Sequence, residues 1–392
     1  MRHRNRAAMR LAGMMVTGAM AAALTVIPGV GMAAEPYRIG AVFAVTGGAS
    51  WLGEPERNTV RMIETQINEA GGINGRPLEV LIEDTVGDET KAVNAVKKLI
   101  TRDQVLAIIG PSRSGTTMAV LPIAERYETP LVSCAAAEAI VVPVKPWVFK
   151  TPQKDADAAI RIYEYMQGHG ISKIAIITGT TGFGDQGRQQ LKRFAPDFGI
   201  DIVADETYGP GDTDMTAQLT RIKGTEAQAV VNWSIVPAQT IVAKNMHQLK
   251  MKIPLFQSHG FGNIKYVEAA GEAAEGIMFP AGRLLAVESL PDDHPQKAVL
   301  EKYKHNYETK FQENVSTFGG HAWDAMHMII NALEAGAETR SEIRDYLEAE
   351  VQGFVGTGGI FNYSAQDHSG LTKDAFEMLV VKDGEFVVLE DE

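Results

Sequence analysis

Short apolar runs and longer amphipathic stretches alternate along most of this chain. The run at residues 37–43 has the length and apolarity of a buried strand, and Val60, Ile63 and Ile67 then recur at helical spacing. The predicted strands of this first array are residues 37–43, 78–82, 105–109 and 131–133, with a helix at 91–100 between two of them. Strands that alternate with helices predict a parallel sheet covered on both faces.

The same pattern begins again after Lys150-Thr151-Pro152, which is typical of a crossover. Its predicted strands are residues 173–178, 200–205, 229–233 and 255–256, and its predicted helices are residues 156–167, 187–198, 216–223 and 238–249. Further helices are predicted at 295–314, 321–335 and 341–350, then a glycine-rich link at 356–359 and antiparallel strands at 375–381 and 385–389. Two similar arrays predict two lobes.

The start of the chain has a different character. Four arginines precede an apolar stretch at residues 11–30, and Gly31 and Ala33 place small residues before Ala34, as at a cleavage site. Residues 1–33 are therefore predicted to be a secretory signal peptide. An uncleaved membrane anchor is the alternative, although the small residues favour cleavage. No cysteine follows the apolar stretch, so no lipid attachment is expected.

Charge and cysteine content narrow the function classes. The chain has 392 residues, 45% hydrophobic and 22% charged, and a formal net charge of −12; removing the four leader arginines makes it −16. An acidic, exported chain without a basic tract is a poor candidate for binding nucleic acid or anionic membranes. The single cysteine, Cys134, cannot form an intrachain disulfide and is expected to pack as a small buried side chain, with a catalytic thiol as the alternative.

A candidate anion site follows the strand at residues 105–109. That strand ends in Gly110-Pro111, and Ser112, Ser114 and Thr116 come before an amphipathic helix. Free backbone N–H groups and short hydroxyls at a helix start can hold a carboxylate. The alternative is an ordinary turn in which a hydroxyl caps the helix. Arg113 is either a second carboxylate partner or a solvated turn residue.

Several stretches, in order along the mature chain, carry a family resemblance. They are Gly71-Gly72-Ile73-Asn74-Gly75 before a strand ending in Glu83-Asp84, Ile108-Ile109-Gly110-Pro111, Ala135-Ala136-Ala137, Phe183-Gly184 and Gly271-Glu272-Ala273-Ala274-Glu275-Gly276. The chain resembles the type I periplasmic solute-binding proteins of the leucine/isoleucine/valine (branched-chain amino acid) group. The resemblance implies an α/β fold with two Rossmann-like lobes, joined by three hinge crossovers near Thr151, Ala281 and Gly356.

The resemblance also implies domain bounds and a function. Lobe 1 would comprise residues 34–151 plus about 283–355, and lobe 2 would comprise 152–282 plus about 356–392. A monomer in the periplasm would close around a small carboxylate-bearing solute, an amino acid or an aromatic or aliphatic acid, and deliver it to the permease of an ABC importer. No cofactor, metal or nucleic acid is expected.

Carried over position by position, the resemblance gives a set of ligand-binding residues. Ser114 and the backbone of Ala135 and Ala137 would hold the carboxylate. Trp51 or Leu52 and Phe183 would form the walls of the pocket, with Ile235 and Phe318 near it. Trp233 is expected in the cleft because it stands at a strand end, and for both Trp51 and Trp233 a buried position in the lobe is the alternative.

Two positions depart from the pattern of amino-acid binders. Ala137 stands where these proteins often have threonine, and His259 stands where they typically have an acidic residue for the ligand's ammonium. Burying an ammonium without a counter-charge is costly. The hypothesis is that the ligand lacks an α-amino group and that His259 donates to a second acceptor on it; a loop histidine bonded to backbone is the alternative.

Two other function classes remain open from sequence. Gly182-Phe183-Gly184-Asp185-Gln186-Gly187 matches G-x-G-x-x-G, with Asp205 at the end of the next strand, as in an NAD-dependent oxidoreductase. Export and the mid-chain position argue against it, and no catalytic set accompanies the motif, so the chain is predicted not to be an enzyme. A ligand-sensing module for a membrane receptor is the second class. His321 and His327, six residues apart, are poorly spaced for one metal and are expected to be core or surface histidines.

Overall fold

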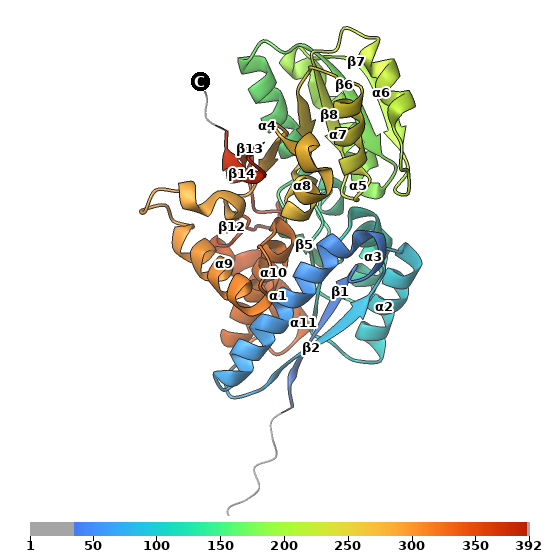
Figure 1. Ribbon diagram of the computed structural model, residues 1–392. Helices are drawn as coiled ribbons and strands as arrows, with labels where there is room; N and C mark the ends of the chain where they lie inside the picture. Colours follow the sequence, from blue (N-terminus) through green and yellow to red (C-terminus); the bar gives the residue numbers. More distant parts are fainter. Residues whose placement is uncertain (1–34, 390–392) are drawn as a thin grey trace, which may run out of the picture. The chain divides into compact units, whose positions relative to one another are not determined.

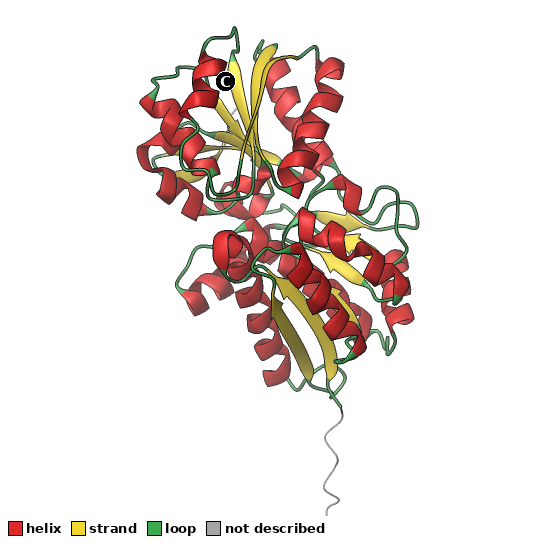
Figure 2. Ribbon diagram, turned by 90° about the vertical axis from the view of Figure 1, so that its right-hand side faces the viewer, coloured by secondary structure: helices red, strands yellow, loops and turns green. Residues whose placement is uncertain are grey.

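Two sheets, each flanked by helices, form the framework of the protein (Figures 1 and 2). The computed structural model describes residues 35–389, so the predicted signal peptide lies outside the described residues. The first sheet is parallel, in the order β2-β1-β3-β4-β5, and its strands are β1 (Tyr37–Phe43), β2 (Leu78–Asp84), β3 (Ala107–Ile109), β4 (Leu131–Ser133) and β5 (Val148–Lys150). Among the helices within residues 35–389, none has the length and apolarity that crossing a membrane requires.

Alternating side chains of β1 face two different helical layers. Tyr37, Ile39, Ala41 and Phe43 belong to one core cluster, whereas Val42 belongs to another. The first cluster includes side chains of α1 (Ser50–Glu69), α10 (Thr317–Glu334) and α11 (Arg340–Glu350), and the second includes those of α2 (Glu89–Thr101) and α3 (Ser114–Arg126). This is the doubly covered sheet that the sequence predicts.

The second sheet repeats this topology and extends it. Its order is β14-β13-β10-β9-β8-β6-β7, so its parallel part, β7-β6-β8-β9-β10, has the same 2-1-3-4-5 order as the first sheet. The strands are β6 (Lys173–Gly179), β7 (Asp201–Tyr208), β8 (Ala229–Trp233), β9 (Leu255–Gln257), β10 (Met278–Ala281), β13 (Glu377–Lys382) and β14 (Glu385–Val388). β13 pairs antiparallel with β14, as predicted for the end of the chain, and also antiparallel with β10, which was not predicted. The predicted fold class is confirmed.

The remaining elements pack around these sheets. The helices of the second array, in chain order, are α4 (Asp155–Gly168), α5 (Gly182–Phe194), α6 (Thr216–Lys223), α7 (Gln239–Gln248) and α8 (Ile264–Ala270). α9 (Lys297–Phe311) packs in a smaller cluster of apolar side chains with α1. Strands β11 (Gln352–Val355) and β12 (Ile360–Asn362) form a separate antiparallel hairpin.

Two helices begin four or five residues earlier than predicted. α5 begins at Gly182 rather than at residue 187, because Thr181 Oγ1 accepts a hydrogen bond from the Gly184 amide and caps the first turn. α10 begins at Thr317 rather than at residue 321, where Ser316 supplies the equivalent cap. Both early turns carry side chains that matter for the site described below.

The glycine-rich stretch at residues 356–359, predicted to be a link, is the turn of the β11–β12 hairpin, since Val355 pairs with Ile360. Phe361, Tyr363, Leu371 and Ala375 beyond it belong to the core cluster of the first sheet. We therefore propose that lobe 1 continues to about residue 375 and that the third crossover lies just before β13, rather than near Gly356.

The connections between the sheets meet beside α10. Gln153 Nε2 donates to the Gly358 carbonyl at 2.6 Å, and Thr151 Oγ1 donates to the carbonyl of His321 at 2.9 Å. A Cβ at Gly282, just after β10, would lie 3.0 Å from the side-chain nitrogen Nε2 of Gln153. The hairpin turn is held by Asp324, whose two carboxylate oxygens accept from the amides of Thr357 at 2.5 Å and Gly358 at 2.8 Å.

Candidate ligand-binding site

A cavity of about 20 Å³ lies where strands of both sheets end. This volume holds about one water molecule, so a solute can enter only when the elements around the cavity move apart. Each of the residues that line it is buried: Cys134, Ala136, Pro152, Phe183, Ile235, His259, Gly260, Thr317, Phe318 and His321.

The topology explains why these residues meet. Ala136 follows the carboxyl end of β4, Ile235 follows β8 and His259 follows β9, while Phe183 stands in the first turn of α5 after β6. In open α/β sheets, ligands bind in the crevice outside the carboxyl ends of the strands. α10 adds its own first turn, which brings Phe318 to the same cavity.

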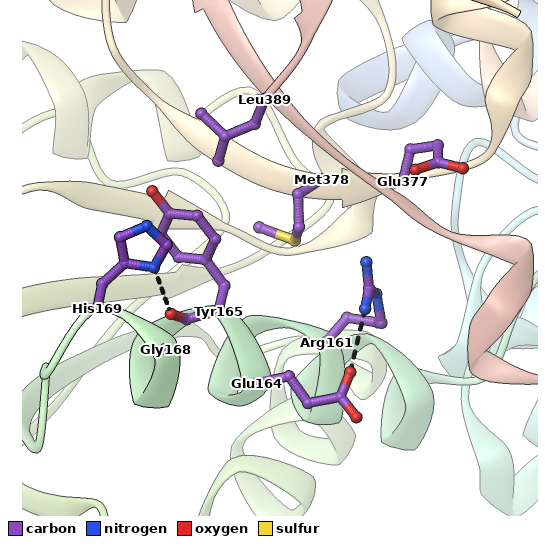
Figure 3. A pocket seen from close by; sticks show the side chains of 8 residues that line it. All are labelled: Arg161, Glu164, Tyr165, Gly168, His169, Glu377, Met378 and Leu389. Atoms are coloured by element: carbon purple, nitrogen blue, oxygen red, sulfur yellow. Dashed lines mark hydrogen bonds and ion pairs between the residues drawn. The ribbon is translucent and has the colours of Figure 1, made fainter. Parts of the chain in front are cut away.

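A larger, open hollow of about 470 Å³ lies elsewhere, between α4, the start of β13 and Leu389 just after β14 (Figure 3). Its charged side chains already have partners: Arg161 pairs with Glu164 at 3.1 Å, and Glu377 pairs with Arg283 at 2.7 Å. His169 Nδ1 lies 2.8 Å from the Tyr165 carbonyl. We therefore take the buried cavity at the strand ends as the candidate site.

Four of the predicted site residues line the buried cavity: Phe183, Ile235, His259 and Phe318. Trp51, Leu52 and Trp233 do not line it, but they belong to or pack against the same apolar cluster as Phe183. The Trp233 ring centroid lies 5.8 Å from that of Phe183 and 5.7 Å from that of His259. Trp233 is fully buried, so it forms a second layer behind the wall of the cavity.

The predicted carboxylate seat consists of Ser114 and the backbone amides of Ala135 and Ala137, and these groups are hydrogen-bonded within the protein in this structure. Ser114 Oγ accepts from the Ala137 amide at 3.3 Å, and Ser133 Oγ accepts from the Ala135 amide at 3.1 Å. These three predicted residues are therefore bonded within the first lobe and do not line the cavity. Arg113 donates to the Gly87 carbonyl at 2.7 Å, which differs from the solvated position considered for it.

Six lining residues are absent from the predicted set: Cys134, Ala136, Pro152, Gly260, Thr317 and His321. His321 is the most informative of them, since it was expected to be a core or surface histidine. It lies one turn after Thr317 on α10 and faces the cavity with Phe318. The signal that could have located it is the helix cap Ser316, because a helix that begins at Thr317 places His321 one turn later on the same face.

The polar groups at the cavity are basic or neutral. Among the described residues that line it, none is acidic. Burial lowers the pKa of His259 well below its ordinary value and that of His321 to about 3, and the nearby Lys150 cation lowers both further. Lys150 is fully buried, and burial lowers its pKa to about 7; its Nζ donates to the carbonyl of Pro152 at 2.8 Å. Both imidazoles are therefore neutral at neutral pH.

Comparison with known proteins identifies the family. The sequence model of the periplasmic binding protein family matches residues 36–385. The chain belongs to this family. A leucine-, isoleucine-, valine-, threonine- and alanine-binding protein of Pseudomonas aeruginosa is 26% identical over 79% of this chain and 81% of its own length.

Solved structures of other periplasmic binding proteins agree. An extracellular ligand-binding receptor from Rhodopseudomonas palustris has a TM-score of 0.85 at 25% identity, covering 90% of this chain and 99% of the other. A branched-chain amino acid transporter substrate-binding protein from Streptococcus pneumoniae, solved with isoleucine, has a TM-score of 0.80 at 26% identity, covering 91% of this chain and 100% of the other.

Membership of a binding-protein family confirms that this periplasmic binding protein is not an enzyme and removes the oxidoreductase interpretation of its G-x-G-x-x-G stretch. Packing explains the three glycines instead. A Cβ at Gly182 would lie 2.7 Å from Gly115 Cα, one at Gly184 would lie 1.8 Å from the Gly179 carbonyl oxygen, and one at Gly187 would lie 2.1 Å from Trp233 Nε1. These distances are too short for any side chain, so the glycines allow α5 to pack closely.

Gly187→Ala is expected to lower the free energy of unfolding by about 1–3 kcal/mol, because the added methyl must displace the fully buried Trp233 ring. Thermal or urea unfolding measures this effect. Gly168→Ala is the matched control, since nothing lies within 4 Å of its added Cβ at the end of α4, and it should be neutral or slightly stabilising. Equal stability of Gly187→Ala and wild type would contradict this account of the glycine.

Proposed function

We propose that the protein captures a small carboxylate without an α-ammonium group, closes its two lobes around it in the periplasm and delivers it to an ABC importer. The observation that carries the proposal is the polarity of the cavity: two neutral histidines line it, Lys150 is buried nearby, and no described lining residue is acidic. An ammonium placed there would lose its hydration without gaining a counter-charge, which costs several kcal/mol.

The names of the relatives support transport of small carboxylates. The Pseudomonas aeruginosa relative is named for binding five apolar or hydroxylated amino acids, and the Streptococcus pneumoniae protein was solved with isoleucine. We infer that this chain keeps the carboxylate end of that chemistry, with Ser114 and the amides of Ala135 and Ala137 as its partners when a ligand displaces their present bonds. At the other end, His259 replaces the acid that an amino acid would need.

Closure of the lobes is supported by contacts between side chains of the two arrays. Asn263 Nδ2 donates to the Trp51 carbonyl at 2.9 Å, joining the loop before α8 to α1. Glu138 accepts from Gln190 at 3.2 Å and from Arg193 at 3.1 Å, both on α5. These contacts would break when the lobes separate, and the buried cavity would then open to solvent.

Thermal unfolding with matched ligands tests the proposal. Leucine and 4-methylpentanoate differ only in the α-ammonium group, and benzoate adds a flat ring. The two acids are expected to raise the unfolding midpoint, since a ligand at about 100 times its Kd adds about 2.7 kcal/mol of stability, and leucine is expected to leave the midpoint unchanged. Titration calorimetry then gives each Kd. Strong leucine binding with no binding of either acid would overturn the proposal.

A further inference from the structure

Three imidazole nitrogens at the cavity have no hydrogen-bond partner within residues 35–389. They are Nδ1 and Nε2 of His259 and Nδ1 of His321. Both rings are more than nine-tenths buried, with exposed fractions of 7% and 6%. A buried polar atom without a partner costs about 1–3 kcal/mol, so two such histidines at one cavity favour the binding of a group that supplies the missing bonds.

The His259 ring is held in place by aromatic neighbours. Phe183, Trp233 and Phe376 all meet it edge to face, with centroid distances of 5.3, 5.7 and 5.6 Å. These contacts limit rotation of the ring away from the cavity. His321 is fixed through its backbone, since its carbonyl accepts from Thr151 Oγ1.

Neutral imidazoles restrict the chemistry of the group that can satisfy them. Each neutral ring has one N–H donor and one nitrogen acceptor, so the pair offers both kinds of partner. A carboxylate only accepts, an ammonium only donates, and a methyl group does neither. A hydroxyl donates and accepts, and it matches both.

A metal ion is a weaker explanation for the pair. Within the described part of the chain, no group of three or more His, Cys, Asp or Glu side chains is arranged to hold one, even though Cys134 lines the same cavity. Burial also raises the pKa of the Cys134 thiol well above its usual range, which disfavours the thiolate that a metal requires.

We propose that His259 and His321 together recognise a hydroxyl group on the ligand, so that the protein selects hydroxylated aromatic acids over their unsubstituted parents. This inference rests on the proposed function, which supplies the carboxylate. Phe183 and Phe318 in the same cavity suit the flat ring that would carry the hydroxyl. A site built to bond a hydroxyl discriminates strongly against a ligand that lacks it, because its own polar groups are then left unpaired.

Titration calorimetry on the full mature chain tests the proposal with benzoate, 3- and 4-hydroxybenzoate, and 4-methoxybenzoate, whose ether oxygen can only accept. Wild type is expected to bind at least one hydroxybenzoate about tenfold or more tighter than benzoate and than the methoxy compound. In His259→Phe and His321→Phe, the preference over benzoate should fall to about twofold or less. His321→Gln keeps a donor and an acceptor and should restore part of the preference.

His327→Phe is the matched control. His327 stands on the same helix and is bonded through Nδ1 to the Trp323 carbonyl at 2.9 Å, so its replacement should leave the preference unchanged. Circular dichroism melting checks that each variant folds. If a phenylalanine variant does not fold, His321→Gln and the wild-type ligand series still test the inference. Benzoate binding to wild type as tightly as every hydroxybenzoate would overturn it.

The outcomes separate this inference from the proposed function. Binding of all the acids with no hydroxyl preference overturns the inference and leaves the proposed function standing. Binding of leucine but of no acid overturns the proposed function, and the hydroxyl preference is then read from tyrosine against phenylalanine and threonine against valine. Equal affinity within those pairs overturns the inference as well, and so does failure of every compound to bind.

Discussion

Asp324→Ala is expected to lower the free energy of unfolding by roughly 4 kcal/mol, because it leaves two buried backbone donors without an acceptor at about 1–3 kcal/mol each. Asp324 is fully buried on α10, and its carboxylate accepts from the amides of Thr357 and Gly358 in the hairpin turn. That turn also contacts Gln153, next to the first connection between the sheets. Urea unfolding followed by circular dichroism measures the loss.

Two further variants make this expectation specific. Asp345→Asn on α11 is the control, because Asp345 pairs only at the surface with its neighbour Arg344, and its loss should cost at most about 1 kcal/mol. Asp324→Asn keeps one acceptor and should be intermediate. An Asp324→Ala protein as stable as Asp345→Asn would show that the turn does not depend on this carboxylate.

The pH dependence of the free energy of unfolding gives a second measurement of the role of Asp324. Burial raises its pKa from 3.8 to about 7, so between these values the folded state binds a proton that the unfolded state has released. The stability associated with Asp324 is therefore fully present below the unfolded pKa and is lost as pH rises through about 7. Wild type should lose stability relative to Asp324→Asn between pH 4 and pH 8, measured by unfolding at each pH.

Sequence patterns predicted those elements whose apolar runs have clear limits. β1, α6 and β8 have the predicted bounds residue for residue: Pro36 precedes β1, Gly224 follows α6, and Gln228 and Ser234 flank β8. β5 and β10 were not predicted. β5 is short and contains the buried Lys150, and β10 contains Pro280, which a strand pattern disfavours because proline lacks an N–H.

The strand pattern located part of the site. Phe183, Ile235 and His259 stand after strands that the pattern located, so the topology brought them together as expected, whereas Phe318 on α10 was predicted from the family resemblance. His321 was missed for two reasons. α10 begins four residues earlier than predicted, and the packing of this helix against the strand ends cannot be read from the strand pattern. The bonds of Ser114 Oγ and Ser133 Oγ to the amides of Ala137 and Ala135 could not be predicted either, since they depend on the exact course of the loop after β4.

His259→Asp is expected to exchange the ligand preference of the protein, with acid binding reduced about 100-fold or more and leucine binding gained. Position 259 is 7% exposed and lies among Phe183, Trp233 and Phe376. A carboxylate there would repel an anionic ligand at low dielectric, where such terms are several kcal/mol, and it would give an ammonium the counter-charge that the wild-type cavity lacks. Calorimetry with leucine and 4-methylpentanoate measures both changes.

The apo variant gives an independent check on this exchange. An unpaired carboxylate at position 259 costs stability, so the His259→Asp protein should melt lower than wild type and should regain stability with leucine, whose ammonium pairs the charge. His259→Asn has a similar size without the charge and should gain no leucine binding. If the asparagine and aspartate variants respond alike to leucine, the charge at position 259 does not decide between acids and amino acids, and the selectivity of this binding protein must lie in the carboxylate seat around Ser114.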